Sequence, residues 1–278
     1  MKAMKLYNGV VMPSIGYGTW QAPDNDITVQ GIKAAVKAGY RHIDTAAIYK
    51  NEISVGKGVA ECGVAREELF VTSKVWNTNR GYKNTLSAFE KTMNDLKLPY
   101  LDLYLIHWPA AAHQFSDWND INRETWRAMT ELYKAGKIKA IGVSNFKPHH
   151  LKALMDAEVK PMVNQIEFHP GMLQKETVKY CNDNGIIVEA WSPLGRGRLL
   201  SDPTLTEIAE KCGKSVAQIC IRWCLQHGTV PLPKSVTEAR IKENIDVFDF
   251  AIEQKDMERI DALDNYGGSG LDPDTVDF

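Results

Sequence analysis

Short runs rich in β-branched and aromatic residues alternate with longer segments of helical periodicity along almost the whole chain. The strand-like runs are residues 14–19, 40–45, 69–76, 101–108, 138–144, 162–168, 186–191 and 229–234. Runs such as "IKAIGV" and "GIIVEA" read as continuously apolar, which is typical of parallel strands covered on both faces. Eight strand–helix units in about 270 residues match a (β/α)8, or TIM, barrel, and the alternative is an open doubly wound sheet. We predict an α/β fold of the barrel type.

No linker, low-complexity tract or change in composition divides the chain, so we expect residues 1–278 to form a single domain. Residues 5–15 read as a small β-hairpin around Asn8 and Gly9, and we expect this hairpin to cap the bottom of the barrel. Helical periodicity is clear in residues 84–98 and 121–136, the second ending at Gly136. The segment from Ile106 to Asn122 is unusually long, and long loops in compact domains are often functional.

The charge balance excludes several classes of partner. With 33 basic and 35 acidic residues the formal net charge is −2, so we expect binding to neither nucleic acid nor an anionic membrane.

No run is long enough to span a bilayer, and the first residues lack the apolar core of a signal peptide. Five cysteines fit a reducing compartment better than a disulfide framework, so we predict a cytoplasmic protein. Cys220 and Cys224 are expected to lie four residues apart on a helix and to pack in the core rather than to bind metal.

Familiar nucleotide and metal motifs are absent. Neither "GYGTWQ" nor "GKGVAE" completes GxGxxG, and "GKS" at 213–215 lacks the upstream glycine of a P-loop. HExxH and CxxC do not occur, and no other spacing indicates a zinc site, so we predict no metal. A nucleotide, if one binds, is not held by a Rossmann or Walker loop.

Four groups capable of chemistry lie on or after predicted strands two to four. Asp44 and Tyr49 belong to "HIDTAAIYKNE" after the second strand, Lys74 lies in the third strand, and His107 ends the fourth. Singly, each has an ordinary explanation, such as a helix cap, a core aromatic, an ion pair or a buried histidine. Because the carboxyl ends of barrel strands meet at one mouth, we expect the four to converge there.

Together these groups can donate a proton to a carbonyl oxygen. A phenol has a pKa near about 10 and is a poor acid at neutral pH, but a nearby ammonium would lower that pKa. An aspartate would hold the ammonium charged and in place, and a histidine could hydrogen-bond the same substrate oxygen. Only a source of hydride is then missing.

The motifs "HIDTAAIYKNE", "LDLYLIHWP", "IGVSNF", "NQIEFHP", "SPLG" and "PKSVTEARIKEN", in this order, resemble the aldo-keto reductase family from about Met4 to Asp264. The resemblance implies a monomeric (β/α)8 barrel that reduces aldehydes and ketones with NADPH and releases NADP+. It implies that Tyr49 is the general acid, that Lys74 and Asp44 tune it, and that His107 orients the carbonyl. Trp191 stands where many members have tyrosine, which is similar to the short bacterial 2,5-diketo-D-gluconate reductase-like members.

The resemblance also implies a cofactor site. Its residues would be Gly18, Thr19, Asp44, Ser144, Asn145, Gln165, Trp191, Ser192, Pro193, Leu194, Gly195, Lys234, Ser235, Val236, Arg240, Glu243 and Asn244. Within this set, residues 144, 145 and 165 match those that hold the nicotinamide carboxamide, and the ring at 191 would stack on the nicotinamide. Residues 192–195 would contact the pyrophosphate. Lys234, Ser235 and Arg240 would face the 2′-phosphate, with Glu243 and Asn244 toward the adenine.

The substrate is less constrained by the sequence. We expect a pocket lined by Trp20, Tyr49, Trp76, His107 and Trp108, with His113 and Trp118 of the long loop closing one side. The short, glycine-rich tail "NYGGSGLDPDTVDF" is expected to leave this pocket smaller and more open than the long tail of mammalian relatives does. Small aldehydes, dicarbonyls and keto sugars all fit such a pocket.

Two other functions remain open at this point. Some relatives of this barrel are regulatory subunits beside ion channels, although the full catalytic set and the lack of an extension argue against that role. A Schiff-base aldolase would use a strand lysine such as Lys74, but that lysine must be neutral and Asp44 would oppose this.

Overall fold

The computed structural model describes residues 3–264 and 268–278. Eight parallel strands form one curled sheet in the order β10-β9-β8-β7-β6-β5-β4-β3. The strands are β3 (Tyr17–Gly18), β4 (His42–Asp44), β5 (Phe70–Val75), β6 (Leu103–Ile106), β7 (Ile141–Ser144), β8 (Val163–Glu167), β9 (Ile187–Trp191) and β10 (Val230–Pro231). Backbone bonds from Gly16 N to Pro231 O and from Gly18 N to Pro233 O, both 3.0 Å, join the first strand to the last and close the barrel. The predicted (β/α)8 fold is confirmed.

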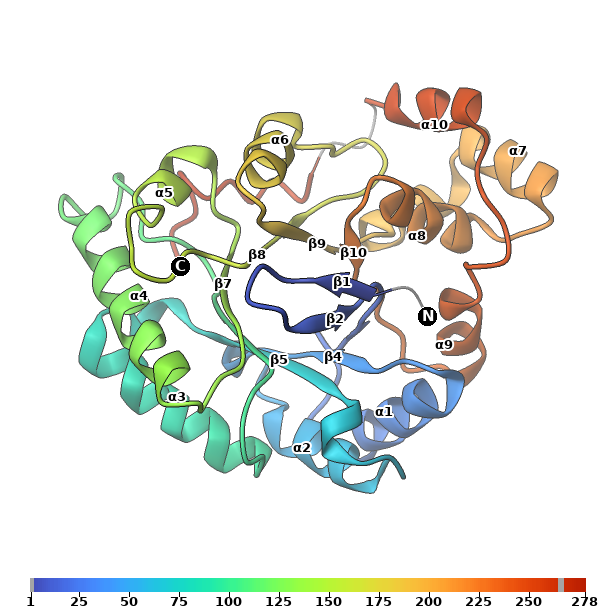
Figure 1. Ribbon diagram of the computed structural model, residues 1–278. Coiled ribbons are helices and arrows are strands. Elements are labelled where there is room, and N and C mark those ends of the chain that lie inside the picture. Colours follow the sequence, from blue (N-terminus) through green and yellow to red (C-terminus); the bar gives the residue numbers. More distant parts are fainter. Residues whose placement is uncertain (1–2, 265–267) are drawn as a thin grey trace.

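Helices surround the strands as an outer ring (Figure 1). They are α1 (Asp26–Ala38), α2 (Glu52–Glu61), α3 (Tyr82–Leu96), α4 (Trp118–Lys134), α5 (Pro148–Lys152), α6 (Lys175–Asp183), α7 (Pro203–Cys212), α8 (Val216–Gln226), α9 (Glu238–Ile245) and α10 (Gln254–Asp261). Local sequence sets their ends: α1 begins after Asn25, whose side chain accepts from Ile27 N, and ends at Gly39 with φ 110°. In the described part of the chain, no helix combines the length and apolarity that crossing a membrane requires.

The predicted hairpin is present at the N-terminus. Strand β1 (Ala3–Lys5) pairs antiparallel with β2 (Val11–Pro13), and Figure 1 shows the pair across the centre of the barrel. Leu6 and Met12 pack in one buried cluster with Phe70 and Leu103, which lie at the amino ends of β5 and β6. The hairpin therefore closes the bottom of the barrel with apolar side chains, and the opposite end is left for a site.

Candidate active site

A cavity of about 1060 Å³ opens at the carboxyl ends of the strands. All of the predicted cofactor residues except Thr19 and Gly195 border it, and so do all five predicted substrate-pocket residues. Thr19 is fully buried, and its hydroxyl donates to the carbonyl oxygen of Asp44 at 2.9 Å. Gly195 is buried with φ +54°, in the turn that follows "SPL". Both residues are therefore buried in the protein and do not line the cavity.

A buried ion pair lies beneath the cavity. The Lys74 ammonium donates to both carboxylate oxygens of Asp44, at 2.7 and 2.8 Å, and to the carbonyl oxygen of Thr45 at 2.9 Å. Lys74 is fully buried, and Asp44 is 4% exposed. Burial is the largest single effect and lowers the pKa of Lys74, but the surrounding charges and hydrogen bond, led by Asp44, together raise it by more, and the net pKa lies above its usual value. The lysine is therefore charged at neutral pH.

Tyr49 ends a short helical turn (Ala47–Tyr49) and borders the cavity. The Lys74 nitrogen is 5.2 Å from the centre of its ring. Burial raises the pKa of the Tyr49 phenol, and the charge of Lys74 lowers it by less than burial raises it. The net direction is upward, contrary to the expectation that the lysine would dominate. Tyr49 is thus protonated at neutral pH and available as a proton donor.

His107 lies between two aromatic rings at the end of β6. Its imidazole makes edge contacts with Tyr49 and Trp76, with ring centres 5.7 and 5.1 Å apart. Burial, with a smaller contribution from Lys74, holds the pKa of His107 well below its usual value, so the ring is neutral. Nδ1 is buried and has no hydrogen-bond partner among the described residues, which leaves Nε2 as the nitrogen available to a ligand.

Side chains from β7, β8 and β9 form one wall of the cavity. Asn145, at φ 63°, accepts from the indole nitrogen of Trp191 at 2.8 Å and donates to the carbonyl oxygen of His107 at 3.0 Å. The Ser144 hydroxyl donates to the backbone oxygen of Gln165 at 2.8 Å. These bonds hold the Trp191 ring in place and fix the spacing of the polar groups beside it.

Basic side chains also border the cavity. Lys234, Ser235 and Arg240, the residues expected to face a 2′-phosphate, border it after β10. The sequence reasoning missed Arg196, which follows "SPLG" and lies over two tryptophan rings, 5.0 Å from the centre of Trp20 and 5.9 Å from that of Trp191. Arg196 forms no ion pair with any residue described by the structure, so its charge is available to an anion.

The tail contributes a ring that the sequence did not reveal. Phe278 stacks on Trp76 with ring centres 5.6 Å apart and meets Trp108 edge-on at 5.3 Å. Asn77 donates to its backbone oxygen at 2.9 Å. The first three residues of the tail expected to leave the pocket open, 265–267, lie outside the described residues. The last residue of the chain forms part of the aromatic wall.

His113 and Trp118 do not border the cavity, contrary to the prediction. His113 is 3.3 Å from the carboxylate of Asp277, and Trp118 packs edge-on against His149 and His150. His113 therefore contacts the tail, and Trp118, the first residue of α4, contacts α5.

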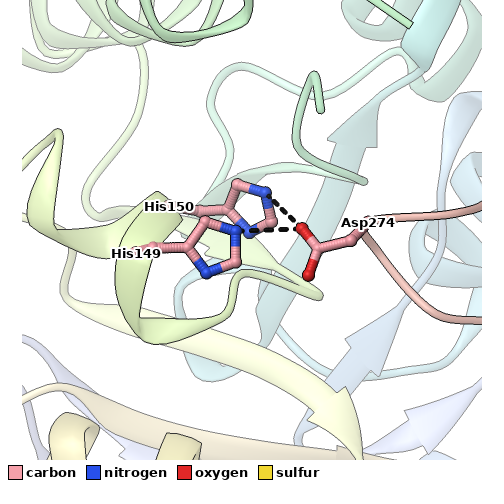
Figure 2. A group of neighbouring side chains, drawn as sticks. All are labelled: His149, His150 and Asp274. Atoms are coloured by element: carbon pink, nitrogen blue, oxygen red, sulfur yellow. Dashed lines mark hydrogen bonds and ion pairs between the residues drawn. The ribbon is translucent and has the colours of Figure 1, made fainter. Parts of the chain in front are cut away.

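His149, His150 and Asp274 form the one group of metal-ligand type found among the described residues (Figure 2). Both Nε2 atoms approach the same Asp274 oxygen, at 2.9 and 3.2 Å. The other Asp274 oxygen accepts from the Lys147 ammonium at 2.8 Å. Nδ1 of His150 accepts from Lys147 N at 3.3 Å, so its Nε2 carries the proton and is not free to bind a metal. We interpret the group as the anchor of the tail on α5.

Comparison with known proteins agrees with this arrangement. Residues 14–265 match the Aldo/keto reductase family. The chain belongs to the aldo/keto reductase family. It is 56% identical over 276 residues to glyoxal reductase of Bacillus subtilis (strain 168), covering 99% of this chain and 97% of that protein. It is 44% identical over 274 residues to methylglyoxal reductase DkgA of Escherichia coli (strain K12), covering 98% and 96%.

Solved structures of similar proteins give the same result. The crystal structure of MGS-M4, an aldo-keto reductase from a deep-sea metagenome library of the Medee basin, superposes with a TM-score of 0.93 at 43% identity and full coverage of both chains. A mutant of Gox0644 in complex with NADPH gives a TM-score of 0.90 at 44% identity, covering 100% of this chain and 99% of that one. The chain is therefore an oxidoreductase of this family, as its motifs predicted.

Proposed function

We propose that this protein reduces small aldehydes and ketones to alcohols, with NADPH as the source of hydride and Tyr49 as the source of the proton. The observation that carries the proposal is the position of a protonated phenol at the cavity wall, directly above the buried Lys74–Asp44 ion pair. Carbonyl reduction requires a proton donor in contact with the oxygen on which negative charge develops.

Each residue has a separate task in this proposal. The nicotinamide cofactor, when bound, supplies the hydride. Tyr49 donates its proton to the carbonyl oxygen as negative charge develops there, and Lys74 stabilises the phenolate left behind. His107, which is neutral, hydrogen-bonds the same oxygen through Nε2 and orients the carbonyl. Trp20, Trp76 and Trp108 exclude water from the reacting carbon.

The polar groups of the cavity fit NADP(H) along its length. The ring of Trp191 offers a stacking surface for the nicotinamide, and the amides of Asn145 and Gln165 lie beside it. Arg196 is well placed for the pyrophosphate, beside residues 192–195. Lys234 and Arg240, which border the cavity, would bind the 2′-phosphate, since guanidinium and ammonium groups both bind phosphate well.

Small α-dicarbonyl compounds are the proposed substrates within this class. Relatives at 56% and 44% identity are named for reduction of glyoxal and methylglyoxal. In this chain four aromatic rings, those of Trp20, Trp76, Trp108 and Phe278, border the end of the cavity where the substrate would lie. Phe278 takes up space there, which favours compact substrates.

The aldolase alternative fits the site poorly. A Schiff-base lysine must be neutral to attack a carbonyl. The pKa of Lys74 is raised by Asp44 despite burial, and all three of its protons are donated inside the protein. Measuring turnover distinguishes a reductase from a regulatory subunit of the same fold, which would show little turnover.

The test is a panel of glyoxal, methylglyoxal, larger aldehydes and keto sugars assayed by NADPH consumption. Wild type should turn over the small dicarbonyls, and Tyr49→Phe should not. Tyr82→Phe is the matched control, because its hydroxyl bonds to Glu131 on the surface and lies outside the cavity. Equal activity of wild type and Tyr49→Phe would contradict the proposed acid, and no turnover of any carbonyl by wild type would contradict the function.

We further propose that residues 1–278 act as a single domain, as a monomer in the cytoplasm, with no metal ion. The nearly even charge balance and the five free cysteines support this reading. Light scattering of the purified chain tests the monomer, and a dimer mass at micromolar concentration would contradict it.

A further inference from the structure

The side-chain amide of Gln165 on β8 lies between two carboxyl groups. Its nitrogen donates to Oδ2 of Asp44 at 2.9 Å and to Oε2 of Glu189 at 2.8 Å. An amide nitrogen carries two protons, and the Asp44 carboxylate only accepts, so the bond to Asp44 defines which end of the amide is nitrogen. The oxygen Oε1 accepts no hydrogen bond from any described residue, and Gln165 borders the cavity. This oxygen is therefore the part of the amide that a ligand can use.

Among the described residues, the carboxyl group of Glu189 on β9 forms a hydrogen bond with Gln165 alone. It is fully buried, and its other oxygen, Oε1, has no hydrogen-bond partner among the described residues. His42 is also close, with its Nε2 3.6 Å from Oε1. A buried polar group that is only partly satisfied costs stability and requires an explanation. Glu189 does not border the cavity, so direct contact with a substrate does not explain it.

The charge on Glu189 matters for its neighbours. Burial, reinforced by Asp44, raises the pKa of Glu189 to about 8. At neutral pH the carboxyl therefore carries a proton, and it accepts from Gln165 without adding a second negative charge beside Asp44. His42 is neutral as well, because burial lowers its pKa to about 3. Glu189 thus acts on Gln165 as a hydrogen-bond acceptor and not as a counter-ion.

We propose that Glu189 is a positioning residue for the cofactor: it holds the amide of Gln165 so that Oε1 faces the NH2 group of the nicotinamide carboxamide. The inference rests on the proposed NADPH site. The complementarity is simple, since the carboxamide NH2 is a donor and needs an acceptor. With only Asp44 to hold it, the amide keeps one unpaired proton and is fixed by one hydrogen bond instead of two, so Oε1 is held less firmly toward the carboxamide.

The test compares two cofactors on two variants. Glu189→Gln keeps an oxygen that can accept from Gln165, and Glu189→Leu removes it at similar volume. Dissociation constants are measured from quenching of tryptophan fluorescence, with NADPH and with reduced 3-acetylpyridine adenine dinucleotide phosphate, in which a methyl group replaces the carboxamide NH2. Losing one oriented hydrogen bond corresponds to a change of about tenfold in Kd.

We expect Glu189→Leu to bind NADPH about tenfold more weakly while its affinity for the acetylpyridine analogue is unchanged, and Glu189→Gln to resemble wild type with both. Should leucine prevent folding, Glu189→Val repeats the test with a side chain that suits a strand. The matched control is Glu52→Leu, which removes another buried carboxyl, one that accepts from Ser73 and Thr92 and lies away from the cavity. It should leave both constants unchanged.

Three outcomes would overturn the inference. Unchanged NADPH affinity in Glu189→Leu means that the bond does not matter to the cofactor. An equal loss with both cofactors means that Glu189 supports the fold and does not act through the carboxamide. If wild type binds neither cofactor, both the proposed function and the inference are wrong. If wild type binds a cofactor and either of the first two results is found, only the inference is wrong.

Discussion

Replacing Lys74 by methionine tests the ion pair on which the proposed chemistry depends. The substitution removes an ammonium whose three hydrogen bonds, of 2.7, 2.8 and 2.9 Å, all lie inside the barrel. Asp44 is left as a buried carboxylate with one side-chain donor, Gln165, at 2.9 Å. Removing one partner of a buried ion pair typically costs about 3–5 kcal/mol, because the other charge is left unpaired. We expect Lys74→Met to lose about that much free energy of unfolding.

A double-mutant cycle shows whether this loss belongs to the pair. Asp44→Asn alone leaves the ammonium of Lys74 with only neutral acceptors and should be similarly costly. The double variant carries neither charge, so it should be no less stable than the worse single variant, with a coupling energy of at least about 2 kcal/mol. Urea unfolding at fixed pH, followed by circular dichroism, measures all four proteins. Additive losses would refute the reasoning, since they would mean that the two groups do not stabilise each other.

The same proteins separate catalysis from binding. Lys74 does not border the cavity, so we expect Lys74→Met to keep wild-type affinity for NADPH. Its kcat should fall by at least about 10²-fold, the lower range for general acid–base groups. Removing the lysine removes the charge that lowers the pKa of Tyr49, which then rises further and makes the phenol a weaker acid. Borohydride with a ketone should trap no adduct on wild-type Lys74.

Three further predictions follow from the site. Tyr49→Phe should lower kcat by at least about 10²-fold without changing NADPH affinity, and retention of more than about a tenth of kcat would mean that another group is the acid. Wild type should bind NADPH more tightly than NADH, and Arg240→Ala should narrow the gap, whereas equal constants in wild type would contradict a 2′-phosphate site. Glu189 holds its proton in the folded state up to its pKa of about 8, compared with 4.5 for the ordinary carboxyl, so stability should fall as pH rises between these values. Relative to Glu189→Gln, wild type should lose about 1.4 kcal/mol per pH unit between pH 5.5 and 7.5, and a constant difference in urea unfolding would show that Glu189 is ionised throughout.

The convergence of the proposed catalytic groups was predictable because barrel topology gathers strand ends. Asp44, Lys74 and His107 lie on neighbouring strands β4, β5 and β6, so their sequence positions were enough to predict that they converge. The direction of the pKa shift of Tyr49 was not predictable in this way. It depends on how far the phenol is removed from water, and burial proved larger than the effect of the lysine.

The residues that the sequence did not reveal act through long-range contacts. Phe278 meets Trp76 across some two hundred residues of chain, and no local pattern marks a phenylalanine that will do this. Glu189 reads as one carboxylate inside an apolar run, and only the register of β8 and β9, which pairs Gln165 with Glu189, shows its partner. His113 and Trp118 were placed wrongly because the sequence does not show that they contact the tail and α5 instead of the cavity.

The charges around Tyr49 explain how a phenol with a raised pKa can serve as an acid. Near Tyr49, the ammonium of Lys74 is paired with the carboxylate of Asp44, and Glu189 and His107 are neutral at neutral pH. Burial therefore keeps the proton on Tyr49 until a carbonyl oxygen acquires charge. In the proposed mechanism, once the proton moves, the phenolate lies beside the ammonium, which stabilises it where water is excluded. In this proposal the lysine acts on the transition state more than on the resting enzyme, so its loss should appear in kcat and leave KM nearly unchanged.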